Sequence, residues 1–411
     1  MFPTKSSSTE IIRRQNSALV LAALRRGGRL AHTELSAATG LSSATVSAIT
    51  AELERAEILV KSEHQPVGGR GRPRVLFEPR RDCGYLIVAS ISSDAFEYSL
   101  VDYSGRLIDR FAEPRMPSGG ATAFSAALKA GLERTVNRAT LDRDAVLAIS
   151  ISSKGLVDAE QPLLLWSPVL GTEQIDFQAL LERDWKARIL LANETQLVAG
   201  ALAGRVERSG QMARRSLAAL SLGHSIGLGL ASQSPAGGCT LASPNFGHML
   251  HQANGALCRC GGRGCIEAYA GFYAILRTAF EVPTDTLPAK FVPLSEVDKI
   301  AALANRGDRG SVHAFRQAGL ALGNGLSRLL SLYEHMPITI TGPGTRYYDL
   351  LRQGIEEGLS QSHAVRLSGM PEIAVISDEG SLVFEGHLDQ ALALVDQDIV
   401  QLRPHSSNNV A

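Results

Sequence analysis

The stretch from His248 to Gly271 reads HMLHQANGALCRCGGRGCIEAYAG and contains three of the five cysteines of the chain. Cys258, Cys260 and Cys265 lie within eight residues, and His248 precedes the first of them by ten positions. Thiolates and an imidazole supplied by one segment suit a tetrahedral zinc ion. Glycines at positions 255, 261, 262 and 264 let the backbone turn tightly around such an ion. The spacing therefore predicts a closed, structural zinc site with these four residues as ligands.

Other interpretations of the five cysteines stay open at this point. His251 competes with His248 as the fourth ligand. A disulfide framework is disfavoured because three clustered cysteines cannot all pair, and because the N-terminal sequence MFPTKSSSTEIIRRQNS lacks the apolar core of a signal peptide. We therefore expect a cytoplasmic chain with reduced thiols. Cys83 and Cys239 lie outside the segment, and we expect them to be ordinary buried thiols.

Composition and charge place the chain among soluble globular proteins of two or three domains. It has 411 residues, of which 45% are hydrophobic and 20% charged. No apolar run approaches the roughly 20 residues that span a bilayer, so we expect no membrane partner. The net charge is zero, yet residues 1–80 contain 12 Lys and Arg against 7 Asp and Glu. A basic head on a mildly acidic body favours contact with a polyanion.

The basic head has the pattern of a helix-turn-helix. Residues 10–26 carry apolar side chains at helical spacing, and a short helix, HTELSAATG, ends at Gly40. A second helix follows in LSSATVSAITAELERAEIL, with Ser42 or Ser43 as its cap. Its buried stripe is Val46, Ile49, Leu53 and Leu59. The polar residues near its first turns are predicted to enter the DNA major groove: Ser42, Ser43, Thr45, Ser47 and Thr50.

A β-wing is predicted directly after this helix. Strand-like segments at 58–60 and 75–77 flank a tip rich in glycine and arginine. Arg70, Arg72 and Arg74 on this tip are predicted to contact DNA phosphates or the minor groove. The alternative is a solvated basic linker between two domains.

From residue 83 onward, strand patterns alternate with helix patterns. This order predicts an α/β architecture with parallel and antiparallel pairing. A hairpin start and glycine loops recur in two halves, which indicates a duplicated lobe with a cleft between the halves. The glycine loops at 223–229 and 342–344 are either phosphate-binding loops or plain turns.

The zinc segment resembles the signature of the ROK family (repressors, open reading frames and sugar kinases), in which Gly-His is followed by Cys-x-Cys-Gly-x-x-Gly-Cys-x-Glu. The matching positions here are Gly247, His248, Cys258, Cys260, Gly261, Gly264, Cys265 and Glu267. The head, with its GRGRPR wing, resembles the repressor branch of that family. The resemblance implies a two-lobed, actin/hexokinase-like (ribonuclease H-like) body behind a winged helix-turn-helix. It also implies a sugar site in the interlobe cleft and a homodimer or homotetramer.

Two departures from the family's sugar kinases make us expect no enzymatic activity. Kinases of the family have an ATP loop of the form Asp-x-Gly-Gly-Thr, whereas the matching stretch here is ASISSDAFEYSL, without a glycine pair. The Asn-Asp pair that holds their catalytic base is Asn193-Glu194 here. The extra methylene of glutamate displaces the carboxylate by more than about 1 Å, which costs about a hundredfold in rate.

By the same resemblance, the sugar contacts carry over to Asn193, Glu194, Asn245, His248 and Glu267. The family's Glu in Gly-Glu-x-Gly-His has become Asn245, and its first Gly has become Pro244. Amides and carboxylates still suit the hydroxyls of a sugar or sugar phosphate, and the changed pocket is expected to select a different sugar. The alternative is a decayed pocket that binds no small molecule.

These predictions divide the chain into three parts. Residues 1–80 form the winged helix-turn-helix, residues 81–195 the first α/β lobe, and residues 196–385 the second lobe with the zinc segment 247–267. A C-terminal helix at about 386–400 returns to the first lobe. We expect a repressor of carbohydrate uptake or catabolism genes that binds double-stranded operator DNA and responds to a sugar. The alternatives are a sugar kinase with a DNA-binding head and a regulator controlled by a protein partner.

Overall fold

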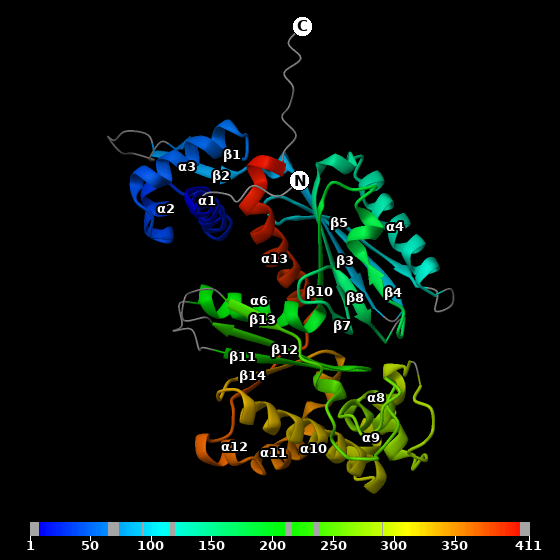
Figure 1. Ribbon diagram of the computed structural model, residues 1–411. Helices are drawn as coiled ribbons and strands as arrows, with labels where there is room; N and C mark the ends of the chain where they lie inside the picture. The colour runs from blue at the N-terminus through cyan, green and yellow to red at the C-terminus, as the bar shows by residue number, and fades with distance from the viewer. Residues whose placement is uncertain are drawn as a thin grey trace. The chain divides into compact units, whose positions relative to one another are not determined.

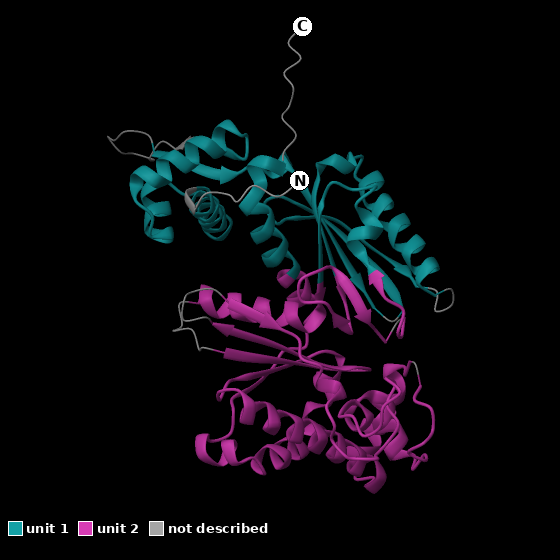
Figure 2. Cartoon of the chain, in the orientation of Figure 1, with its two compact units in different colours: residues 1–151, 176–191, 387–411 teal, residues 152–175, 192–386 magenta. Residues whose placement is uncertain are grey.

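The computed structural model of the chain divides into two compact units (Figure 2). Unit 1 comprises residues 1–151, 176–191 and 387–411, and unit 2 comprises residues 152–175 and 192–386. The structure describes residues 8–64, 74–92, 94–115, 120–168, 170–209, 216–233, 239–289 and 291–402. The boundaries of the three predicted parts remain a prediction.

The N-terminal head of unit 1 is a winged helix-turn-helix, as predicted (Figure 1). Its elements are α1 (Ser8–Gly27), α2 (His32–Thr39), α3 (Ser43–Arg55), β1 (Leu59–His64) and β2 (Arg74–Pro79), and the two strands pair antiparallel. Gly40 ends α2 in the left-handed conformation, with a φ of 71°. Ser42 caps α3, because its hydroxyl accepts the backbone N–H of Thr45 at 3.2 Å.

The buried faces of these helices are partly as predicted. Val46, Ile49 and Leu53 of α3 are buried, and Leu59 is buried on the strand that follows. In α1, Leu21 and Leu24 are buried, but the other apolar residues of the predicted pattern are exposed: Ile11, Ile12 and Leu19. The first turns of α1 are held by ion pairs instead, such as that between Arg14 and Asp398. Helical spacing predicted the helix but not the face that is buried.

The body of unit 1 contains a five-stranded sheet with the order β10-β6-β3-β4-β5. Its strands are β3 (Tyr85–Ile91), β4 (Ala95–Asp102), β5 (Leu107–Pro114), β6 (Val146–Ser153) and β10 (Arg188–Asn193). All eight residues of β6 are buried, as expected for a central strand. The helices α4 (Gly120–Arg138) and α5 (Phe177–Leu181) complete this part of the chain.

Unit 2 repeats this arrangement in a second five-stranded sheet with the order β13-β12-β11-β14-β15. Its strands are β11 (Ser216–Leu222), β12 (Ile226–Gln233), β13 (Cys239–Ala242), β14 (Ile338–Thr341) and β15 (Ile373–Val375). In both sheets the first three strands along the chain are antiparallel neighbours. A fourth strand then lies beside the first of them, and a fifth lies beside the fourth. The predicted α/β class and its internal duplication are therefore confirmed.

Helices pack against the second sheet in two clusters of buried residues, one of which contains α6. They are α6 (Glu194–Arg208), α7 (Glu267–Ala270), α8 (Phe272–Ala279), α9 (Leu294–Asn305), α10 (Arg309–Leu332), α11 (Tyr348–Ser360) and α12 (His363–Ser368). A small sheet of β7 (Leu156–Val157), β8 (Leu163–Trp166) and β9 (Ile175–Asp176) was missed by the sequence analysis, because two of its strands have only two residues.

A close backbone contact fixes α6 against β12. A Cβ atom at Gly229 would lie 1.8 Å from the carbonyl oxygen of Thr195 and 3.0 Å from the Cβ of Ala199. Only glycine allows the first turn of α6 to approach the strand this closely. The glycine-rich stretch 223–229 therefore serves strand and turn packing, and Gly229 brings Thr195 beside the sheet.

The last helix, α13 (Glu379–Leu402), belongs to unit 2 as far as Gly386 and to unit 1 from His387 onward. Within unit 1 it carries Asp396, whose side chain is 1% exposed. This carboxylate accepts both guanidinium nitrogens of Arg25 in α1 and the hydroxyl of Tyr103 at 2.7 Å. The Arg25 guanidinium also lies 4.6 Å from the centre of the Tyr103 ring. Asp396 thus joins the DNA-binding head, the β4–β5 turn and the C-terminal helix.

We predict that Asp396→Asn destabilises unit 1 by about 3 kcal/mol, because it leaves the buried Arg25 charge without its carboxylate. Urea unfolding monitored by the fluorescence of Trp185, in a Trp166→Phe background, measures the change. Asp144→Asn is the matched control: it removes the exposed partner of Lys186 and is expected to cost less than about 1 kcal/mol. Equal effects of the two substitutions would contradict the prediction.

His387 of α13 is completely buried in unit 1. Its Nδ1 lies 2.7 Å from the hydroxyl of Ser150, and its Nε2 has no hydrogen-bond partner among the described residues. Burial lowers the pKa of His387 to about 3. The folded chain therefore excludes a proton that the unfolded chain binds below pH 6.5.

We predict that unit 1 loses about 2 kcal/mol of stability from this group as the pH falls from 6.5 to 5, since each pH unit contributes about 1.4 kcal/mol. The loss is absent above pH 6.5, where His387 is neutral in both the folded and the unfolded chain. Urea unfolding gives the free energy of unfolding at each pH. The difference between the wild type and His387→Asn separates the contribution of His387 from that of the carboxylates. Parallel pH curves for the two proteins would refute it.

Candidate functional site

The four predicted metal ligands come together in unit 2. Suitable donor atoms of His248, Cys258, Cys260 and Cys265 all lie within 4.8 Å of one another. The Nδ1 of His248 lies 3.5 Å from the Cys258 Sγ, and the Sγ atoms of Cys260 and Cys265 are 3.7 Å apart. All five cysteines of the chain are free thiols.

Backbone hydrogen bonds hold these four residues together in what we call the Cys3His cluster. The N–H of Cys258 donates to the carbonyl of Gly262 at 2.9 Å, and the N–H of His251 donates to that of Gly264 at 2.7 Å. Gly264 has a φ of 77°, and a Cβ atom there would lie 1.8 Å from the carbonyl oxygen of Gln252. This position therefore excludes every other residue type. The tight backbone turns of the Cys3His cluster explain why glycines alternate with cysteines in this segment.

The donor set fits zinc. With Zn–S bonds of about 2.3 Å and Zn–N bonds of about 2.0 Å, the edges of a tetrahedron measure about 3.8 Å between sulfurs and about 3.5 Å between sulfur and nitrogen. The observed separations of 3.7 and 3.5 Å match these edges. Burial raises the pKa of Cys258 to about 11, so this thiol needs a bound cation to become the thiolate that binds metal.

The structure also tests the expectations for His251 and for the two remaining cysteines. His251 lies outside the cluster, and its ring packs against Tyr269 with centroids 4.9 Å apart, so His248 is the better fourth ligand. Cys83 is buried as predicted, but Cys239 is exposed. Cys239 lies on β13, which forms one edge of the second sheet.

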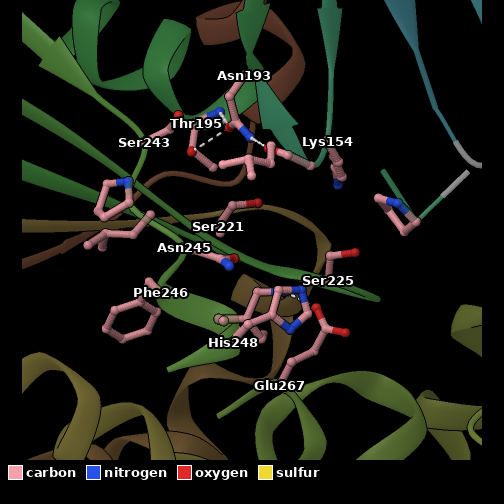
Figure 3. A pocket seen from close by; sticks show the side chains of 18 of the residues that line it. Lys154, Asn193, Thr195, Ser221, Ser225, Ser243, Asn245, Phe246, His248 and Glu267 are labelled. Carbon is pink, nitrogen blue, oxygen red and sulfur yellow. Dashed lines mark hydrogen bonds between the residues drawn. The ribbon is translucent and has the colours of Figure 1, made fainter. Parts of the chain in front are cut away.

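A pocket opens beside the Cys3His cluster, and all of its lining residues belong to unit 2 (Figure 3). Asn193, Asn245, His248 and Glu267 line it, as the resemblance implied. Glu194 does not; its carboxylate lies 3.6 Å from the ammonium nitrogen of Lys154. The ring of Trp166 also lines the pocket and meets the His248 ring edge-on at 5.3 Å.

Glu267 is a fixed acceptor in the wall of this pocket. Its side chain is 3% exposed; one oxygen accepts the Ile226 N–H at 3.2 Å, and the other accepts the Arg259 Nη2 at 3.1 Å. Arg259 also donates to the hydroxyl of Ser225 at 2.9 Å. A buried carboxylate persists only with such compensation.

Three hydrogen bonds within the protein hold the Asn193 amide in the pocket wall. Its Nδ2 donates to the carbonyl of Gly155 at 2.7 Å. Its Oδ1 accepts the N–H of Thr195 at 2.9 Å and the hydroxyl of Thr195 at 2.7 Å (Figure 3). Asn193 is the N-cap of α6, so these bonds tie the start of the helix to the β6–β7 turn.

The sequence analysis missed Lys154, Trp166 and Arg259. Lys154 directly follows the buried strand β6, and strand ends of this kind commonly form ligand sites in α/β folds. Arg259 stands between two metal ligands, Cys258 and Cys260. These positions were available as signals, whereas the contribution of Trp166 depends on a short sheet that has no clear pattern.

The residues predicted to contact DNA lie in the head of unit 1. Ser43 and Ser47 are exposed on α3, Thr45 is half-buried, and Ser42 serves as the cap. Thr50 is corrected: it is 1% exposed, and its hydroxyl donates to the Val46 carbonyl at 3.0 Å, so it packs inside the head.

Of the wing arginines, only Arg74 lies in the described part of the chain. Its guanidinium donates to the carboxylate of Glu34 at 3.0 Å. Arg70 and Arg72 lie outside the described residues. Their predicted contacts with DNA remain a prediction.

Comparison with known proteins identifies the family of the body and the class of the head. Residues 93–383 match the model of the ROK family, and residues 14–60 match that of the winged helix-turn-helix DNA-binding domain. The chain belongs to the ROK family. The xylose repressor of Bacillus spizizenii is 24% identical over 92% of this chain and 97% of its own. The DNA-binding transcriptional dual regulator NagC of Escherichia coli is 22% identical over 85% of both chains.

Solved structures of ROK proteins share the fold. A ROK family transcriptional regulator, a homologue of the E. coli MLC protein, superposes with a TM-score of 0.71 at 21% identity, covering 94% of this chain and 99% of its own. A ROK glucokinase from Streptomyces griseus, solved with glucose and AMPPNP, has a TM-score of 0.54 at 21% identity and covers 75% of this chain and 99% of its own. No helix in the described part of this ROK chain is long and apolar enough to cross a membrane.

We predict that Cys260→Ser lowers zinc affinity at least about 100-fold, because it removes one of four ligands from a site without a substitute. Zinc content after dialysis against a chelator, measured by atomic emission, is the test. Cys239→Ser is the control, since this exposed thiol lies outside the cluster and its loss is expected to leave zinc content unchanged. Full zinc retention in the Cys260 variant would contradict the assignment.

Proposed function

We propose that this ROK protein is a cytoplasmic, homo-oligomeric transcriptional repressor of carbohydrate uptake or catabolism genes. It binds operator DNA through the winged helix-turn-helix and responds to a sugar in the unit 2 pocket. The observation that carries the proposal is the presence in one chain of a DNA-binding head and a pocket lined by Asn245, His248 and Glu267. Relatives named as xylose and N-acetylglucosamine repressors support it.

The head supports insertion of α3 into the major groove. Ser43 and Ser47 project from the exposed face of the helix, and the buried face of Val46 and Leu53 fixes its orientation. Short hydroxyls are poor at bidentate base recognition, so wing arginines and DNA shape contribute to specificity.

The pocket supports binding without phosphoryl transfer. The segment that corresponds to the kinase ATP loop, residues 89–100, lies mostly in β3 and β4, and the hydroxyl of Ser92 donates to Asp94 at 2.8 Å. The residue at the position of the catalytic base, Glu194, is paired with Lys154 at 3.6 Å and does not line the pocket. A general base must reach the proton it removes, so we propose that the chain is not an enzyme.

Zinc, when bound, supplies the positive charge that stabilises the Cys258, Cys260 and Cys265 thiolates and fixes the His248 ring. His248 and Glu267 then stand at the two ends of one rigid segment and face the ligand. α13 continues without interruption from Glu379 in unit 2 to Leu402 in unit 1, where Asp396 holds the head. We propose that a ligand acts on DNA binding through the spacing of the two heads in a dimer, because half-sites lie about one helical turn apart.

The major-groove assignment predicts that Ser47→Glu lowers DNA affinity at least about tenfold, because a carboxylate on the exposed face of α3 opposes the phosphates. Fluorescence anisotropy with a duplex selected from a random library by the wild-type protein measures affinity. Thr122→Glu, on an exposed position of α4, is the matched control and is expected to bind normally. Unchanged DNA affinity of the Ser47 variant would show that this face of α3 does not contact DNA.

Sugar control is tested by adding a panel of sugars and sugar phosphates to the complex with the same duplex. Release of DNA by one of them, without ATP, supports the repressor proposal. ATP-dependent phosphorylation of a hexose would support the kinase alternative instead. If no compound changes DNA binding or thermal stability, regulation by a protein partner becomes the better explanation.

A further inference from the structure

Lys154 occupies the part of the pocket wall where the family resemblance placed a carboxylate. It lies in the turn between β6 and β7, and its side chain lines the pocket (Figure 3). The side chain is 32% exposed, whereas that of Glu194 is 13% exposed and is not part of the lining. A ligand in this pocket therefore meets an ammonium donor at this place.

The charge of Lys154 is already compensated by the protein. Its Nζ lies 3.6 Å from Oε2 of Glu194. A second carboxylate, that of Glu379, accepts the hydroxyl of Thr341 at 2.8 Å and adds to the negative potential at the ammonium. Burial opposes the charge on Lys154, but the two carboxylates outweigh burial and raise its pKa. The ammonium is therefore charged, and Glu194 and Glu379 offset part of that charge.

The other charged group of the lining is compensated in the same way. Glu267 pairs with Arg259, and both side chains are at most 11% exposed. An anionic ligand at Lys154 would add a third negative charge beside Glu194 and Glu379 and would compete with Glu194 for the ammonium. An unpaired buried charge is strongly unfavourable.

An uncharged sugar meets no such obstacle. The ammonium of Lys154 has three donors, and a hydroxyl oxygen accepts one of them while the contact with Glu194 persists. Asn245, which is exposed at the pocket, offers both a donor and an acceptor, and the Trp166 ring offers an apolar face. Each of these groups suits a neutral polyol.

We propose that Lys154 determines the ligand selectivity of this ROK protein. Its ammonium, held by Glu194, donates to a hydroxyl of an uncharged sugar, and the held pair excludes sugar phosphates and sugar acids. This inference rests on the proposed function, because it presumes that a sugar binds in the pocket.

Trp166 provides a direct probe for the test. The chain has two tryptophans, so Trp185→Phe leaves Trp166, a pocket residue, as the single fluorophore. The full-length, zinc-loaded protein is titrated with D-xylose, D-glucose and N-acetylglucosamine, and separately with the 6-phosphates of the last two, glucuronate and gluconate. Isothermal calorimetry repeats each titration without relying on fluorescence.

The wild-type pocket is expected to bind at least one uncharged sugar and to bind the anionic compounds at least about tenfold more weakly. Lys154→Met keeps the apolar stem and is expected to weaken that sugar at least about tenfold, because a charged hydrogen-bond donor is lost. Glu194→Gln releases the ammonium and is expected to improve binding of an anionic compound at least about tenfold. Lys299→Met is the matched control, since it breaks an exposed Lys–Glu pair of unit 2 and is expected to change nothing.

The outcomes separate this inference from the proposed function. A wild-type preference for sugar phosphates or sugar acids would overturn the role of Lys154 and leave sugar control intact. Unchanged selectivity in both the Lys154 and the Glu194 variants would overturn it as well. Absence of binding to every compound, by fluorescence and by calorimetry, would overturn both proposals together.

Discussion

The ligand pocket depends on three backbone segments that approach one another more closely than side chains permit. Gly229 on β12 meets the carbonyl of Thr195 at the start of α6, where even a Cβ atom would clash. The amide of Asn193 then ties this helix start to Gly155 in the β6–β7 turn. Backbone contacts and a satisfied amide are rigid, so the groups they carry, Lys154 among them, hold their places before a ligand binds. Preorganisation of this kind reduces the entropy that binding costs.

Electrostatic compensation is the second organising feature of the site. Lys154 is balanced by Glu194, and Glu267 by Arg259 and a backbone N–H. The ligand therefore meets fixed donors and acceptors of nearly balanced charge. In the Cys3His cluster, buried thiols likewise need a bound cation to ionise, so their negative charge would be balanced by a metal ion. Paired charges and amides of this kind suit the hydroxyl groups of a neutral ligand, which is the basis of the proposed sugar response.

The head of the molecule is basic, but much of its charge is used inside unit 1. Arg25 and Arg14 pair with Asp396 and Asp398 of the C-terminal helix, and other head arginines pair with acidic residues nearby, as Arg74 does with Glu34. The excess of positive charge in residues 1–80 thus overstates what is available to DNA. These pairs attach α1 to α13, so the charges that the sequence assigned to a nucleic acid also fix the head on its own unit.

Sequence alone determined the elements whose causes are local. Glycine and cap residues defined the helix-turn-helix, alternating patterns defined the α/β class, and one short segment contained all four metal donors, because neighbouring residues bring these together whatever the rest of the chain does. Tertiary structure decided everything that depends on distant neighbours. It buried Thr50, exposed Ile11 and Cys239, and paired Lys154 with Glu194, although forty residues separate the two. A one-dimensional pattern records the type of each side chain, but only packing decides which of two such groups faces the ligand.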